Sequence, residues 1–127
     1  RPGDERPDDG RPDDGRAGAR GPIRVLVAED SPTVRGLLVA LFASDPGFAV
    51  IGEVTNGADA VAEAIARRPD LITMDVQMPV MDGLGATKAI MREAPTPILI
   101  VSAAASQADA GLSFSAMQAG ALMVVPK

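Results

Sequence analysis

The sequence predicts an α/β fold in which helices cover a parallel β-sheet. Short, nearly continuous apolar runs recur along the chain, and stretches with helical periodicity separate them. This alternation is typical of βαβ units. Only three of the 127 residues are aromatic, so the core is aliphatic. Because crossovers between parallel strands are right-handed, we expect a doubly wound sheet of five strands.

The first strand is predicted at Ile23–Ala28, an apolar run typical of a strand that is buried on both faces. Ser31 is suited to cap a helix, and Pro32 suits its first turn. An apolar stripe at helical spacing then predicts a helix over Thr33–Ser44. A turn follows, and Phe48–Glu53 is predicted as the second strand.

The alternation continues through the rest of the chain. A helix is predicted at Ala58–Arg68, where Pro69 ends it, and the strand Asp70–Asp75 ends on a carboxylate. The remaining predicted elements are the helix Leu84–Ala94, the strand Pro97–Ser102, a weak Ala-rich helix at Ser106–Gly120 and the strand Ala121–Val125.

Residues 1–21 differ in composition from residues 22–127. They contain the motif RPDDG twice in tandem and no large apolar residue. Such a segment cannot bury enough surface to offset the entropy of ordering it, so we expect a disordered or extended tail before one domain. The tail lacks the apolar core of a signal peptide, and no apolar run is long enough to span a membrane.

The composition excludes several kinds of chemistry. The chain has no Cys and no His, which rules out thiolate catalysis, His-dependent triads and metal sites built on these ligands. Its net charge of −5 argues against binding to nucleic acid or to an anionic membrane. Carboxylates, hydroxyls and a few cations remain as candidates for function.

Polar side chains follow four of the five predicted strands. Glu29 and Asp30 come after the first strand, Asp75 ends the third, Ser102 ends the fourth and Lys127 follows the fifth. Functional sites of open α/β sheets form at the carboxyl ends of the strands. We therefore expect these residues to converge on one site.

The residue types at this predicted site favour phosphoryl chemistry. Carboxylates that lie close together repel one another unless a cation enters, and oxygen ligands without His or Cys suit Mg²⁺ or Mn²⁺. An aspartate can also act as a nucleophile and form an aspartyl phosphate. Ser102 and Lys127 would then contact the charged oxygens of the phosphoryl group.

These motifs resemble those of a response-regulator receiver domain. The resemblance rests on the acid pair, on D-V-Q-M-P-V-M-D-G at Asp75–Gly83, on Ser102-Ala103 and on the final Pro126-Lys127, and it covers Ile23–Lys127. Within receivers, the stretches A-E-D-S-P-T-V-R, S-D-P-G-F-A-V-I-G, R-P-D-L-I-T-M-D and I-M-R-E-A-P-T-P-I are most similar to the regulatory domain of chemotaxis protein-glutamate methylesterases.

The resemblance implies a flavodoxin-like receiver fold with strand order 2-1-3-4-5, from which the final helix is missing in this chain. It also implies a role for each site residue. Asp75 would be the phosphoacceptor and a ligand of Mg²⁺ or Mn²⁺. Asp30 would bind the metal directly, Glu29 through water, and Gln77 through its backbone carbonyl. Ser102 and Lys127 would contact the phosphoryl group.

The same resemblance implies partners and a location. A histidine kinase would donate the phosphoryl group, and a C-terminal methylesterase domain outside this chain would be the regulated output. Chemoreceptors would interact through that domain, in the cytoplasm, without nucleic acid or membrane insertion. The domain itself is then a regulatory phosphoacceptor, and the enzyme is the parent protein, a protein-glutamate methylesterase and deamidase.

Other functions remain as alternatives. The domain could stand alone or control another output such as a DNA-binding domain. An aspartate-nucleophile phosphatase would carry D-x-D, but Gln77 holds its second position. A flavin-binding module would need a phosphate-binding loop after the first strand and an aromatic residue to pack on the flavin ring, and the sequence offers neither there. The motif GxxxxGK followed by Ser or Thr is also absent, which argues against a P-loop nucleotidase.

Two residues depart from the receiver pattern. Glu29 replaces the commoner Asp, and Val124 stands where receivers usually carry an aromatic residue. The resemblance also implies that Pro79 and Gly83 shape the loop after the third strand, where glycine tolerates backbone angles that are unfavourable for other residues.

Overall fold

The computed structural model describes residues 21–103 and 110–127. The predicted tail, with its RPDDG repeat, therefore lies outside the described residues, apart from Gly21. Helices and strands alternate along the described chain in this order: β1 (Ile23–Ala28), α2 (Pro32–Ala43), β2 (Phe48–Val54), α3 (Gly57–Arg67), β3 (Leu71–Met74), α4 (Gly83–Glu93), β4 (Ile98–Ser102), α5 (Ala110–Ala119) and β5 (Met123–Pro126).

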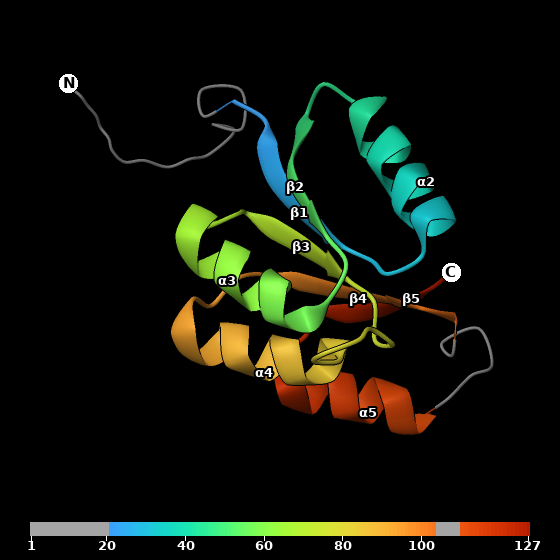
Figure 1. The fold of residues 1–127 in the computed structure, drawn as a ribbon, viewed down its shortest axis with the longest axis vertical. Coiled ribbons are helices and arrows are strands. Elements are labelled where there is room, and N and C mark those ends of the chain that lie inside the picture. Colours follow the sequence, from blue (N-terminus) through green and yellow to red (C-terminus); the bar gives the residue numbers. More distant parts are fainter. Residues whose placement is uncertain (1–20, 104–109) are drawn as a thin grey trace.

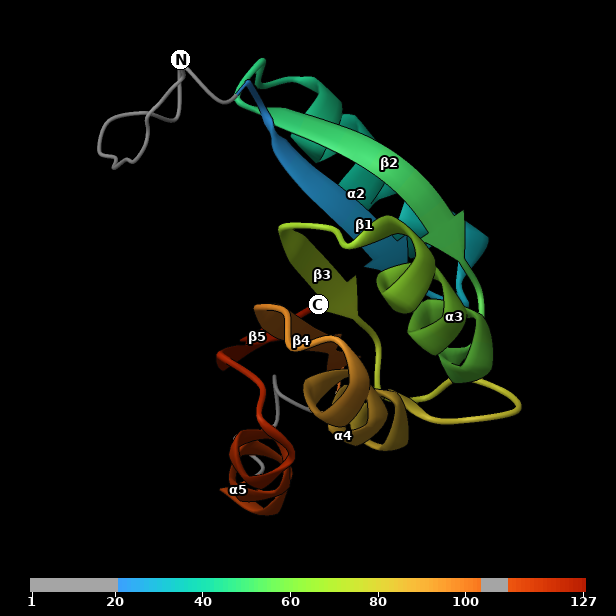
Figure 2. The ribbon, with the colours of Figure 1, turned by 90° about the vertical axis from the view of Figure 1, so that its left-hand side faces the viewer.

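The five strands form one parallel sheet in the order β2-β1-β3-β4-β5, as expected. Helix α2 covers one face of the sheet, and α3, α4 and α5 lie side by side on the other (Figure 1). Figure 2 shows the same layers from the side. This arrangement brings the carboxyl ends of β1, β3, β4 and β5 to one edge.

The main core lies between the sheet and the three-helix layer. Alternate strand residues point into it, among them Leu26, Ile72 and Ile100, and they meet Ala60 of α3 and Ile90 of α4. Small alanines on the helices let the backbones approach the branched side chains of the strands. The core is aliphatic, as the composition predicts.

Local sequence signals set the starts of the helices. Ser31 accepts a hydrogen bond from the Val34 amide at 3.3 Å and caps α2, with Pro32 in the first turn. Asn56 and Asp82 cap α3 and α4 in the same way.

The last strand begins later than predicted. It was expected at Ala121–Val125, but it spans Met123–Pro126. The cause is the end of α5, where Gly120 has a φ of 109° and the Ala121 amide donates to the carbonyl of Ala116. This Schellman arrangement uses the residues after the helix to complete its hydrogen bonds. The predicted beginning of the helix, at Ser106, lies outside the described residues.

The sheet face that carries α2 is only partly covered. Leu37 and Leu41 of α2 are about three-fifths exposed, at 60% and 59%, and Met123 of β5 is 52% exposed. No helix follows β5 in this chain, which ends at Lys127. Among the described helices, none is long and apolar enough to cross a membrane.

Candidate functional site

Backbone pairing extends one residue beyond the strands and positions the candidate residues. The Glu29 amide donates to the carbonyl of Val54 at 3.0 Å, and the Asp75 amide donates to that of Ala28 at 2.9 Å. The Lys127 amide donates to the carbonyl of Ser102 at 3.3 Å. Each residue is therefore held by a neighbouring strand, and three strand ends meet at one edge.

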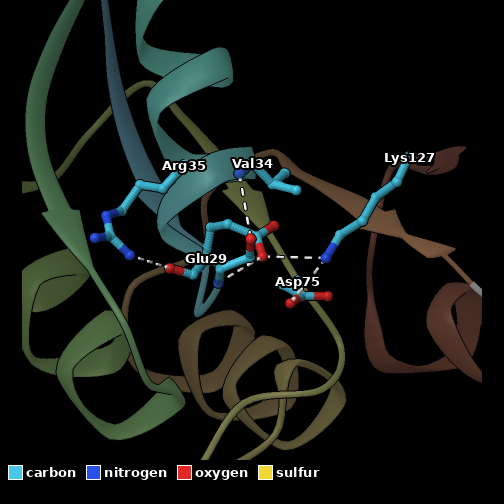
Figure 3. Close-up of polar contacts among 6 residues, drawn as sticks. Glu29, Val34, Arg35, Asp75 and Lys127 are labelled. Atoms are coloured by element: carbon cyan, nitrogen blue, oxygen red, sulfur yellow. Dashed lines mark hydrogen bonds and ion pairs between the residues drawn. The ribbon is translucent and has the colours of Figure 1, made fainter.

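Lys127 connects the two buried carboxylates of the site. Its Nζ lies 3.1 Å from Oε2 of Glu29 and 3.2 Å from Oδ2 of Asp75. Figure 3 shows the lysine reaching from the end of β5 toward both acids. Glu29 is fully buried and Asp75 is 5% exposed, whereas the Lys127 side chain keeps 21% of its surface in contact with solvent. The ammonium of Lys127 therefore compensates the negative charge of two carboxylates that are buried away from water.

Burial shifts the protonation equilibria of this group. It raises the pKa of Glu29 above the usual value, and the nearby Asp75 adds to the effect. The hydrogen bonds from Lys127 and from the Ser31 amide oppose the rise without cancelling it. Burial alone would lower the pKa of Lys127, but its contacts with Glu29 and Asp75 together raise that pKa above the usual value.

One carboxylate oxygen of this group can still accept a hydrogen bond or bind a cation. Oε1 of Glu29 is buried and has no hydrogen-bond partner, whereas Oε2 accepts from both Lys127 and Ser31. A buried acceptor without a partner is unfavourable, and a bound cation would satisfy it. The carboxylates of Glu29 and Asp75 are the hard oxygen ligands that Mg²⁺ prefers. The donor set therefore fits a magnesium ion.

The structure brings together only part of the predicted site. Asp30 is exposed, and within residues 21–103 and 110–127 no three acidic side chains are gathered as they would be around a metal ion. Ser102 is buried at the end of β4, on the same edge as Lys127. Gln77 lies in the loop after β3, with an exposed side chain.

The loop after β3 is held by close backbone contacts. The Gly83 amide donates to the carbonyl of Val76 at 2.8 Å, and the Gly57 amide donates to that of Met81 at 2.9 Å. Gly83 has no positive φ, so its tolerance of unusual backbone angles does not explain the glycine at this position. Glycine is required there because the carbonyl group of Asp75 packs directly against its Cα.

Arg35, which none of the sequence motifs singled out, also contacts the site. Its Nη1 donates to the carbonyl of Glu29 at 3.0 Å, and its Nε lies 3.4 Å from Oε1 of Glu53. A signal for this contact does exist in the sequence. Arg35 is the fourth residue of the helix that follows the acid pair, and a long helical side chain reaches back toward the amino end of its helix.

Residues 25–127 match the family of the response regulator receiver domain. This chain belongs to that family. The receiver is 52% identical over 106 residues to a protein-glutamate methylesterase/protein-glutamine glutaminase of Myxococcus xanthus. These residues are 84% of this chain but 30% of that relative, so the receiver spans less than a third of the relative's length.

Solved structures give the same assignment. The response regulator domain of Thermotoga maritima CheB superposes with a TM-score of 0.79 and 39% identity, covering 84% of this chain and 78% of that one. The receiver domain of a Pseudomonas aeruginosa sensor histidine kinase has a TM-score of 0.72 and 31% identity, with 84% and 85% covered. That neighbour holds a magnesium ion in its active site cleft.

The raised pKa of Glu29 predicts a pH dependence for the metal-free receiver. Because folded Glu29 binds its proton more readily than the unfolded chain does, its contribution favours folding below pH 4.5 and is lost as the pH rises through the raised pKa. Glu29→Gln removes this loss, so we expect the difference in melting temperature between the variant and the wild type to shift in favour of the variant as the pH rises from 4.5 to neutral without Mg²⁺. Thermal melts followed by circular dichroism check this.

Magnesium should affect the melting temperatures of the two proteins differently. A ligand that binds only the folded state stabilises it, and Glu29→Gln loses a carboxylate from the binding site. We expect Mg²⁺ to raise the melting temperature of the wild type more than that of the variant. An equal rise in both proteins would show that Glu29 does not contribute to metal binding.

Proposed function

We propose that this receiver accepts a phosphoryl group on Asp75 from a histidine kinase in a Mg²⁺-dependent reaction. The observation that carries the proposal is the Lys127 ammonium, which lies within 3.2 Å of carboxylate oxygens from both Glu29 and Asp75 at the carboxyl edge of the sheet. An oxygen of Asp75 attacks phosphorus, the phosphorus–nitrogen bond of the phosphohistidine breaks, and an acyl phosphate forms. The imidazole leaves with the electron pair of that bond.

Four residues of the site would hold the magnesium ion. Asp30 and Asp75 would hold Mg²⁺ directly, Glu29 through water, and Gln77 through its carbonyl oxygen. The unpartnered Oε1 of Glu29 supports this assignment. When bound, the metal neutralises charge on the transferred phosphoryl oxygens.

Lys127 and Ser102 would act on the phosphoryl group itself. The ammonium of Lys127 already lies beside Asp75, so it can move from the carboxylates to the new phosphoryl oxygens without crossing the site. Ser102 stands at the end of the neighbouring strand, where its hydroxyl would donate a hydrogen bond to the same group. Both contacts would form most strongly after phosphoryl transfer.

Phosphorylation by a small molecule tests this function without the kinase. Incubation of the chain with acetyl phosphate and Mg²⁺ should add one phosphoryl group per molecule, seen by intact mass spectrometry. The same incubation with a chelator should add none. Failure of the Mg²⁺ sample to gain mass, or an equal gain with the chelator, would contradict the proposal.

The proposed output is a protein-glutamate methylesterase and deamidase domain that follows this receiver in the parent protein. The name of the 52% identical relative supports this, since the receiver covers only 30% of it. The parent would act on chemoreceptors in the cytoplasm. An exposed apolar group on α5 and just before β5, formed by Phe114, Met117 and Leu122, is a suitable surface for packing against that domain.

Phosphorylation should reach this surface through Ser102 rather than through Val124. Val124 packs against the core, and valine has neither a ring nor the rotamers of an aromatic switch. A beryllofluoride phosphoryl mimic should change amide exchange across residues 110–120 severalfold in wild type and Val124→Ile, but not in Ser102→Ala. Equal loss of the response in both variants, with the mimic still bound, would show that the fifth strand carries the signal.

A further inference from the structure

Arg35 joins three elements next to the site. It lies in the first turn of α2, and its guanidinium donates to the carbonyl oxygen of Glu29 at the end of β1, at 3.0 Å. The same guanidinium pairs with Glu53 in β2, with Nε and Oε1 3.4 Å apart. The Arg35 side chain is 21% exposed, so water screens these contacts only partly.

The carbonyl that Arg35 contacts lies where β1 leaves the sheet. The preceding carbonyl, that of Ala28, accepts from the Asp75 amide, and the Glu29 amide still pairs with β2 through Val54. The Glu29 carbonyl lies beyond this ladder, where Arg35 supplies a charged donor. A buried strand end needs such a donor, because an unpaired carbonyl is unfavourable there.

Fixing this peptide also fixes the direction of the acids. The carbonyl of Glu29 belongs to the peptide that joins it to Asp30, and the Glu29 side chain accepts from the Ser31 amide at 3.1 Å. Rotation of that peptide would change the backbone angles at Glu29 and Asp30, from which both side chains depart. Figure 3 shows Arg35 on the opposite side of Glu29 from Asp75 and Lys127.

We infer that Arg35, held by Glu53, is a positioning residue that fixes the Glu29–Asp30 peptide for metal binding. Among the described residues, the polar contacts of the Arg35 side chain are with Glu29 and Glu53, and not with Asp75 or Lys127. Arg35 therefore acts on the site through Glu29. The metal-binding half of this inference rests on the proposed function. The positioning half does not, because it concerns backbone order in the metal-free chain.

Amide exchange without metal tests the positioning. Arg35→Ala should speed exchange at the Glu29 and Ser31 amides by about tenfold, the effect expected for loss of one hydrogen bond to a charged group. The Asp75 amide, which bonds to Ala28, serves as an internal reference and should change much less. Arg92→Ala is the matched control, because Arg92 forms an exposed ion pair with Glu93 on α4, away from the site.

Unchanged exchange at Glu29 and Ser31 in Arg35→Ala would overturn the inference. Equal acceleration at Asp75 would overturn it too, because it would show general destabilisation instead of local positioning. Arg35→Lys should restore part of the wild-type protection, since its ammonium can still pair with Glu53 but cannot reach two acceptors with a planar fork.

Titration with Mg²⁺, followed by amide chemical shifts, tests the consequence for the metal. Arg35→Ala should bind Mg²⁺ about tenfold more weakly than wild type, the usual effect of losing an outer partner of a metal ligand. Arg92→Ala should bind as wild type does. If wild type binds and Arg35→Ala binds equally well, the metal-binding half of the inference fails while the proposed function stands. If wild type itself does not bind, the proposed function and the metal-binding half of the inference fail, and the exchange experiment still decides the positioning.

Discussion

Asp75→Asn is expected to abolish the Mg²⁺-dependent gain of one phosphoryl group. The substitution keeps the size of the side chain and its place at the end of β3, but a neutral amide is a poor nucleophile toward phosphorus. It also removes one of the two negative charges beside Lys127. We therefore expect a folded protein that gains no mass with acetyl phosphate during the time in which wild type is fully modified.

The control for Asp75→Asn is Asp45→Asn. Asp45 is exposed in the turn before β2, where its side chain accepts from the Gly47 amide, a contact that asparagine can also make. This variant should be phosphorylated at the wild-type rate. If Asp75→Asn gains mass at that rate, another carboxylate is the acceptor. Peptide mapping would then distinguish Glu29 from Asp30.

The fold and the location of the site follow from simple sequence signals. Polar residues follow four of the five apolar strand runs, and parallel strands place such ends on one edge. This is enough to predict that Glu29, Asp75 and Lys127 lie close together. It does not predict that the ammonium of Lys127 bridges the two acids, which depends on side-chain reach at a buried edge.

Asp30 and Arg35 show what sequence patterns cannot supply. Adjacent residues of an extended chain point in opposite directions, so a buried Glu29 leaves Asp30 exposed. The place of Arg35 in the first turn of α2 favours its contact with Glu29, but its pairing with Glu53 joins α2 to β2 and follows no local periodicity. Similarly, the apolar Ala121-Leu122 pair suited a strand, but the Ala121 amide bonds back to Ala116 at the end of α5, whereas the Leu122 amide already pairs with Ile98 of β4.

Gly83→Ala is expected to cause the largest loss of stability among single-methyl additions near the site. A methyl group on Gly83 would overlap the carbonyl oxygen of Asp75 and lie 2.8 Å from its carbonyl carbon and 2.9 Å from the Cα of Val76. All three atoms belong to the backbone, so no flexible side chain can move aside. We expect the free energy of unfolding to fall by about 3 kcal/mol, at the upper end for overpacking.

The matched control is Gly36→Ala in α2. Nothing lies within 4 Å of a methyl group placed there, and Gly36 is inside a helix. Alanine should therefore raise the free energy of unfolding by about 1 kcal/mol through its higher helix propensity. Urea unfolding followed by circular dichroism measures both variants, since the chain has no Trp for fluorescence. If Gly83→Ala unfolds at the wild-type urea concentration, the tight packing of α4 against the Asp75 backbone is refuted.

Where the variant still folds, it should also be phosphorylated more slowly, because the clash can be relieved only by moving α4 or the peptide that carries the phosphoacceptor.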